Sequence, residues 1–233
     1  MSFNVNLNKK MAPPIFFNYY GLWIELIYSL IVVLSCFLIY FKTKEMYKLT
    51  SYKGIKYFRN TFLFFGITYF VRFFLHLIRT LMVDRIFGIF EIAFFVMIYS
   101  SSMALIYLIY SLFWKKLAKY PYIKTSLFHI ASLIIAFISI ISEAPFIFLI
   151  FQGGLFILLT IISYLYHKKT KHKESFFQLY LIYLLIFVLW IISNILEFVV
   201  YFSPNLGLII YGISILLFLI ILFRVLKKVD AKG

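Results

Sequence analysis

Cysteine and acidic residues are scarce in this sequence. Cys36 is the single cysteine among 233 residues, so no disulfide can form within the chain. Only 8 residues are Asp or Glu, against 23 that are Lys or Arg, and the formal net charge is +15. The chain must therefore be stabilised without disulfides, and its excess of positive charge requires an explanation.

Apolar residues, in contrast, are far more abundant than in a water-soluble domain. They make up 64% of the chain, and the mean hydropathy is +1.01, whereas soluble domains are roughly 45–50% apolar. A chain of this length cannot bury so many apolar side chains in a soluble core, because small domains retain a large surface relative to their volume. The composition therefore indicates that lipid surrounds the protein.

Seven apolar segments are long enough to cross about 30 Å of hydrocarbon at about 1.5 Å per residue. They span residues 20–41, 61–82, 87–113, 126–142, 146–166, 176–201 and 206–225. Pro204 stands where proline is favoured, at the start of the last segment. The sequence predicts an all-α integral membrane protein with a single transmembrane domain, residues 1–233, formed by a bundle of about seven helices.

Lysine and arginine are concentrated in alternate links between these segments. The links after the first, third and fifth segments and the C-terminal tail hold six, four, four and four of them, together 18 of 23. The six in the first link are Lys42, Lys44, Lys48, Lys53, Lys56 and Arg59. Because positive residues beside a span stay in the cytoplasm, we expect a multi-pass protein of the cell membrane with its N-terminus outside and its C-terminus in the cytoplasm.

The positive charge has a membrane explanation rather than a nucleic-acid one. The lysines lie in short links beside the membrane, and no nucleic-acid-binding fold is recognisable. Such links attract the anionic lipids of the cytoplasmic face. We therefore predict the lipid bilayer and its anionic lipids as partners and no nucleic acid, and we leave open a cytoplasmic protein that docks on the links.

Acidic residues have the opposite distribution. Glu25, Glu91 and Glu197 lie about one to one and a half turns inside their spans, in the half that is expected to face outside. Asn194 shares a helical face with Glu197. These residues place polar groups of three different spans at a similar depth.

The second span supplies positive charge at this depth. Arg72, His76 and Arg79 fall within about 60° of one another at about 100° per residue, so one helix face carries all three. A charge near the bilayer centre costs at least ~2.5–3.5 kcal/mol and nearly always faces the bundle interior. We expect Arg72 to pair with one of Glu25, Glu91 and Glu197. The predicted polar cluster comprises Glu25, Arg72, His76, Arg79, Glu91, Asn194 and Glu197.

Two interpretations of this cluster remain open. It is either a closed network that fixes the helix register or an outward-opening pocket for a small polar ligand or ion. His76, Glu91 and Glu197 have donor atoms that suit a metal, but they form no tight ligand motif. We therefore predict no metal site, no cofactor and no catalytic residue.

Smaller polar residues occur in the interior of other spans. Ser100, Ser101 and Ser102 in the third span offer hydroxyl groups for bonds between helices, and Gln152 lies within the fifth. We expect these residues to serve helix packing.

Two classes of function fit this pattern best. The bundle resembles the seven-helix input modules of microbial signalling proteins, and the resemblance implies a sensor or receptor-like function. A small transporter of a polar solute or ion is the alternative, with three-plus-one-plus-three spans forming parallel repeats. A membrane-embedded enzyme acting on lipids is a third class, which no motif supports. Retinal chemistry is excluded, because residues 206–225 contain no lysine for a Schiff base.

Overall fold

The computed structural model describes residues 19–81, 87–117, 125–141, 150–157, 160–161, 188, 192 and 204–230. Its helices are α1 (Tyr19–Thr50), α2 (Lys53–Leu81), α3 (Phe87–Leu117), α4 (Thr125–Ile141) and α7 (Pro204–Asp230). Residues 150–157 form a further helical segment. No strand occurs in these ranges, so the described part of the chain is all-helical, as the sequence predicts.

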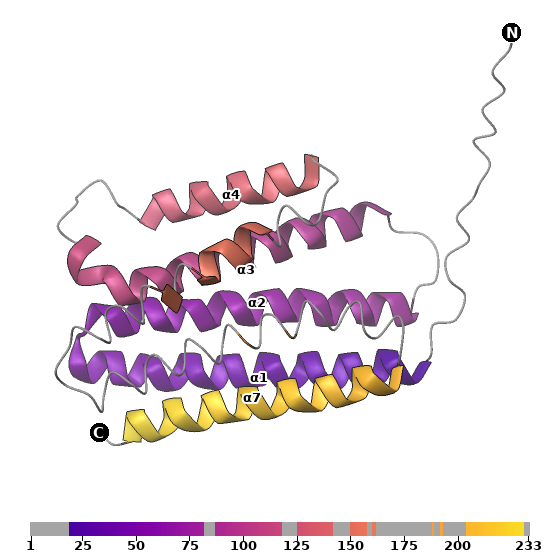
Figure 1. The fold of residues 1–233 in the computed structure, drawn as a ribbon, viewed down its shortest axis with the longest axis horizontal. Coiled ribbons are helices and arrows are strands. Elements are labelled where there is room, and N and C mark those ends of the chain that lie inside the picture. The colour runs from indigo at the N-terminus through magenta and orange to yellow at the C-terminus, as the bar shows by residue number, and fades with distance from the viewer. Residues whose placement is uncertain are drawn as a thin grey trace, which may run out of the picture.

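The five named helices lie side by side in the order α7, α1, α2, α3 and α4 (Figure 1). Neighbours from α1 to α4 are antiparallel, whereas α7 runs in the same direction as α1 (Figure 1). The C-terminal ends of α1, α3 and α7 therefore meet the N-terminal ends of α2 and α4 at one end of the bundle. We call this the basic end, because these helix ends carry Lys42, Lys44, Lys48, Lys53, Lys56, Arg59, Lys115, Lys116, Arg224, Lys227 and Lys228.

Four of these helices are long and apolar enough to cross a membrane. The candidate spans are Trp23–Thr50, Lys53–Ile78, Gly88–Ser111 and Leu208–Lys227, and they overlap the first, second, third and last predicted segments. Helix α4 is apolar but has only 17 residues. About half of the predicted segment 146–166 and nearly all of 176–201 lie outside the described residues, so the count of seven stays a prediction.

The first basic link is much shorter than the sequence suggested. Both helices continue through the lysine-rich stretches, and Ser51 and Tyr52 alone separate α1 from α2. Lysine is a good helix former, so the helices do not need to stop where the hydrocarbon ends. Ser51 stops α1 with a left-handed φ of 50°, and its N–H donates a hydrogen bond of 2.8 Å to the carbonyl of Tyr47.

The turn is packed against α3. The rings of Tyr52 and Trp114 meet edge to face with centroids 5.0 Å apart. Gly54 lies beneath them, and a Cβ at this position would come within 2.6 Å of the Tyr52 ring and 2.9 Å of the Trp114 ring nitrogen. Only glycine leaves room for this contact, which fixes the α1–α2 turn on the end of α3.

The interior contains two groups of buried side chains. The larger joins α1, α2, α3, α7 and the segment 150–157, and it includes Cys36, Phe62, Leu108, Phe156 and Phe218. The smaller joins α2, α3 and α4 around an aromatic group that includes Tyr107. These contacts hold the helices in the order seen in Figure 1.

The outside of the bundle is also apolar. Large side chains are more than half exposed on α1, α2, α4 and α7, for example Leu34, Phe70, Ile138 and Phe223. Helices that are apolar both inside and outside the bundle are typical of a lipid environment.

Candidate functional site

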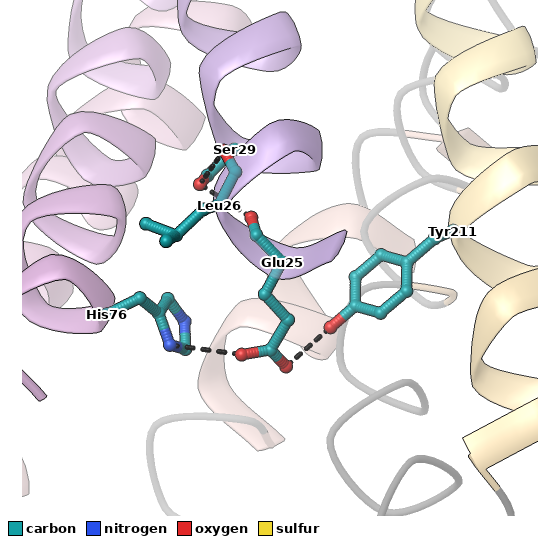
Figure 2. A network of polar contacts seen from close by, with 5 residues as sticks. All are labelled: Glu25, Leu26, Ser29, His76 and Tyr211. Carbon is teal, nitrogen blue, oxygen red and sulfur yellow. Dashed lines mark hydrogen bonds and ion pairs between the residues drawn. The ribbon is translucent and has the colours of Figure 1, made fainter. Parts of the chain in front are cut away.

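Three helices bring polar side chains together at the end of the bundle opposite the basic end. Glu25 lies near the start of α1, His76 near the end of α2 and Tyr211 near the start of α7. In Figure 1, α2 runs antiparallel to α1 and α7 runs parallel to it. These three positions therefore meet at one level, where their side chains are in contact (Figure 2). The register of the helices, rather than proximity in sequence, builds the site.

The carboxylate of Glu25 is the centre of this site (Figure 2). Its Oε2 lies 3.0 Å from Nδ1 of His76, and its Oε1 accepts a hydrogen bond of 2.5 Å from the hydroxyl of Tyr211. The side chains of Glu25 and His76 are 18% and 11% exposed. One carboxylate therefore connects α1, α2 and α7 with both of its oxygens. We call Glu25, His76 and Tyr211 the Glu25 cluster.

The backbone of α1 supports the position of Glu25. The hydroxyl of Ser29 donates to the carbonyl oxygens of Glu25 at 2.7 Å and of Leu26 at 3.1 Å (Figure 2). Ser29 is buried, and these bonds satisfy its hydroxyl within its own helix. The carboxylate of Glu25 takes no part in these bonds and contacts the neighbouring helices instead.

A layer of tyrosines lies next to the Glu25 cluster. The ring of Tyr28 packs 5.0 Å from that of Tyr211 and 5.9 Å from that of Tyr69. The hydroxyl oxygens of Tyr28 and Tyr69 are 3.4 Å apart, and all three side chains are at most 5% exposed. Tyr28 lies three residues after Glu25 on the same side of α1. The three tyrosines come from α1, α2 and α7, so the same three helices also contact one another deeper in the bundle.

Arg72 acts on this site through its charge. It lies one turn before His76 on α2 and is half-buried. Its guanidinium attracts the carboxylate of Glu25 and influences the hydroxyl of Tyr211. Of the three partners that the sequence offered for Arg72, Glu25 lies near it, and His76 makes the direct contact with that carboxylate. Glu197 lies outside the described residues, so the pairing of Arg72 stays a prediction.

The remaining predicted residues do not all join the Glu25 cluster. Glu91 is exposed on α3 and makes no hydrogen bond or ion pair with any described residue. Arg79 lies in α2, but its side chain is outside the described part of the structure. Asn194 and Glu197 also lie outside the described residues. The structure thus brings together Glu25, Arg72 and His76 from the predicted set.

The three tyrosines were not predicted from the sequence as part of the site. Tyr211 is one of the few polar residues of an otherwise apolar helix, and it lies near the start of that helix, as Glu25 does in α1. That position was the available signal. It could not identify the partner, because hydroxyl groups occur on many faces of this tyrosine-rich chain.

Smaller polar contacts join the other helices. The hydroxyls of Thr68 and Ser100 are 2.8 Å apart, and Nε2 of Gln152 donates to the hydroxyl of Ser101 at 2.8 Å. The hydroxyl of Tyr99 lies 2.6 Å from Nδ1 of His129. Ser100 and Ser101 of α3 therefore provide bonds between helices that the sequence predicts, whereas Ser102 makes none with the described residues.

Chemically, the Glu25 cluster combines a carboxylate, an imidazole and a phenol in a largely dehydrated site. Ionisable side chains inside a membrane protein are costly and are typical of ligand, ion or proton sites. In the described part of the chain, no three metal-binding side chains lie together. Glu25 and His76 supply the carboxylate and the imidazole of this site, 3.0 Å apart.

Comparison with known proteins gives one informative match. No family model matches the chain, and no solved structure matches it. The chain is 35% identical over 212 residues to an uncharacterized protein of Archaeoglobus fulgidus. The alignment covers 88% of this chain and 92% of that protein, so the similarity extends over nearly the whole of both.

Proposed function

We propose a sensor or receptor-like function for this chain, which belongs to the same family as the uncharacterized protein of Archaeoglobus fulgidus. In this proposal the chain forms a seven-helix bundle in the cell membrane, with its N-terminus outside and its C-terminus in the cytoplasm. The Glu25 cluster then faces the outer side and the basic end faces the cytoplasm. Four helices that are long and apolar enough to cross a membrane support the membrane location in this proposal. The basic helix ends support its orientation.

The observation that carries the proposal is that one carboxylate of α1 contacts two other helices, α2 and α7. Glu25 holds α2 through His76 and α7 through Tyr211, both at the same end of the bundle. The opposite ends of the same three helices carry the basic residues. A change at Glu25 can therefore alter how the ends of α1, α2 and α7 are arranged on the other side of the membrane.

The signal proposed is a small polar ligand or ion that competes for Glu25. A ligand shifts a conformational equilibrium only if it binds one state better than the other. A cation that binds the carboxylate would favour the state in which Tyr211 has released it. Loss of this hydrogen bond weakens the contact between α7 and α1 at the site.

Distance measurements across the basic end test this function. Lys44 on α1 and Lys227 on α7 are exposed, so both can be replaced by spin-labelled cysteines in a Cys36→Ala background. We expect Glu25→Gln and Tyr211→Phe to change the distribution of distances between the labels. Ser214→Ala, which alters the same face of α7 one turn later, is the control. An identical distribution in all four proteins would contradict the sensor proposal.

The second candidate is a proton-linked transporter with three-plus-one-plus-three spans. The contact between Glu25 and His76 supports it, because chains of carboxylate and histidine side chains relay protons in pumps and transporters. Liposomes that contain the protein and a pH-sensitive dye distinguish the two functions. A proton flux driven by a solute gradient and lost in Glu25→Gln would favour transport over sensing.

A further inference from the structure

We propose that Arg59, held between the rings of Tyr40 and Tyr47, binds the phosphate group of an anionic lipid at the basic end. The guanidinium carbon of Arg59 lies 5.2 Å from the ring centroid of Tyr40 and 5.8 Å from that of Tyr47. This site is at the opposite end of the bundle from the Glu25 cluster. The inference therefore does not depend on the sensor function.

The two rings orient Arg59 before any ligand binds. Tyr40 and Tyr47 are seven residues apart on α1, so they lie on one helix face two turns from each other. A guanidinium over aromatic rings is attracted by their π-electrons. Nε of Arg59 is buried and has no hydrogen-bond partner among the described residues. A planar donor group that is already fixed loses little freedom when it binds a phosphate.

Among the described residues, no ion pair joins Arg59 to a carboxylate. The ends of α1 and α2 at the turn carry six basic residues, and Glu45 is the one acidic residue among them. The carboxylate of Glu45 lies 3.5 Å from Nζ of Lys42, and both side chains are exposed. At about 100° per residue, Glu45 lies about 140° around α1 from Tyr40, on another face. A phosphate is the kind of anion that can neutralise Arg59.

The position of Arg59 along the bundle corresponds to lipid headgroups. Helix α1 has 32 residues and is about 48 Å long at about 1.5 Å per residue, which exceeds the ~30 Å of hydrocarbon. Lys44 stands seven residues before Ser51, and Arg59 stands seven residues after Tyr52, so the two basic residues lie at the same height. Lys44 lies between Tyr40 and Tyr47 on their face of α1 and supplies a second positive group at this level.

The helix face below Arg59 favours a lipid over a soluble phosphate. Phe70 follows Arg59 by eleven residues, about three turns, and falls within about 20° of the same face. Its side chain is 52% exposed. Leu63, one turn from Arg59, is half-buried on this side of α2. An acyl chain can lie against this apolar face while its phosphate contacts Arg59.

Thermal unfolding of the purified full-length protein in a zwitterionic detergent tests the proposal. The probe is a short-chain phosphatidylglycerol, compared with phosphatidylcholine of the same chain length. We expect phosphatidylglycerol to raise the unfolding temperature of the parent, and Arg59→Gln to lose at least half of this rise. Arg59→Lys preserves the charge but not the planar group, and we expect it to lose part of the rise. Lys53→Gln removes one charge from the exposed start of α2. This variant should retain the full rise in unfolding temperature.

Three results would overturn the proposal. Equal losses in Arg59→Gln and Lys53→Gln would mean that the lipid responds to total charge rather than to Arg59. If phosphatidylglycerol raised the unfolding temperatures of Arg59→Lys and Arg59→Gln as much as that of the parent, Arg59 would not bind the lipid. Inorganic phosphate or glycerol phosphate that produces the same Arg59-dependent rise without lipid would identify a soluble anion as the ligand.

Discussion

The hydroxyl of Tyr211 lies 2.5 Å from a carboxylate oxygen of Glu25, although the two residues are 186 positions apart in the chain. This bond joins the last described helix to the first. It occurs where the ring of Tyr211 also packs against Tyr28, at a centroid distance of 5.0 Å. The packing of the ring fixes the hydroxyl, and the hydroxyl in turn holds the carboxylate between α7 and α2.

Removal of this hydroxyl should destabilise the bundle. Tyr211→Phe keeps the ring and leaves one oxygen of Glu25 without its donor, so we expect a loss of about 1–3 kcal/mol in the free energy of unfolding. Ser214→Ala is the matched control, because Ser214 lies one turn later on the buried face of α7 and its hydroxyl has no partner among the described residues. Unfolding in a detergent series measures both variants. Equal losses would show that the bond to Glu25 contributes nothing.

Adjacent serines on α3 provide a second comparison. Ser101 accepts a hydrogen bond of 2.8 Å from Gln152, whereas the buried hydroxyl of Ser102 has no partner among the described residues. We expect Ser101→Ala to cost about 0.5–1.5 kcal/mol, in the range of bonds between membrane helices, and Ser102→Ala to cost less. Unfolding measurements on the two variants decide this, and a larger loss in Ser102→Ala would contradict the assignment.

The helices themselves were largely predictable from the sequence, because long apolar runs leave few alternatives in lipid. The segments 20–41, 61–82, 87–113 and 206–225 all overlap helices of sufficient length. The ends of the helices were harder to predict. Hydropathy marks where the hydrocarbon ends, but lysine-rich turns continue α1 and α2 beyond that point.

The polar site was predictable in part, and for a physical reason. Arg72, Glu25 and His76 are costly in a membrane, so their presence alone indicates a buried cluster. The identity of the contacts depends on the relative rotation of three helices, which the sequence does not specify. Glu91 fits the same pattern in sequence, yet it is exposed on α3. Tyr211 was not predicted because the free-energy cost of one hydroxyl in an apolar helix is small, so its presence does not by itself indicate a polar site.

Orientation in the membrane can be tested at the two ends of the bundle. Ser51 lies in the exposed turn at the basic end, and Gly88 lies at the opposite end, where an added Cβ would meet no atom within 4 Å. In a Cys36→Ala background, we expect Ser51→Cys to react with a membrane-impermeant thiol reagent only from the cytoplasmic side and Gly88→Cys only from outside. The physical reason is retention of lysine-rich helix ends in the cytoplasm. The reverse labelling pattern would invert the proposed topology.

The contact between Glu25 and His76 makes the sharpest prediction about the site. The carboxylate and the imidazole are 3.0 Å apart and mostly shielded from solvent. Removal of either partner should leave the other without its main polar contact. We therefore expect Glu25→Gln and His76→Asn each to lower the free energy of unfolding by about 2–4 kcal/mol.

A double-mutant cycle separates this contact from general damage to the fold. If the two groups interact directly, the loss in the double variant should be smaller than the sum of the single losses by about 1–3 kcal/mol. Glu25 and Lys44 are nineteen residues apart on α1, about 28 Å along the helix, so Glu25→Gln combined with Lys44→Gln should be additive within about 0.5 kcal/mol. Arg72→Gln combined with Glu25→Gln should give an intermediate coupling, because Arg72 acts on the carboxylate through its charge. Additive losses for Glu25 and His76 would mean that the two side chains do not stabilise each other, and the Glu25 cluster would then lose its connection to α2.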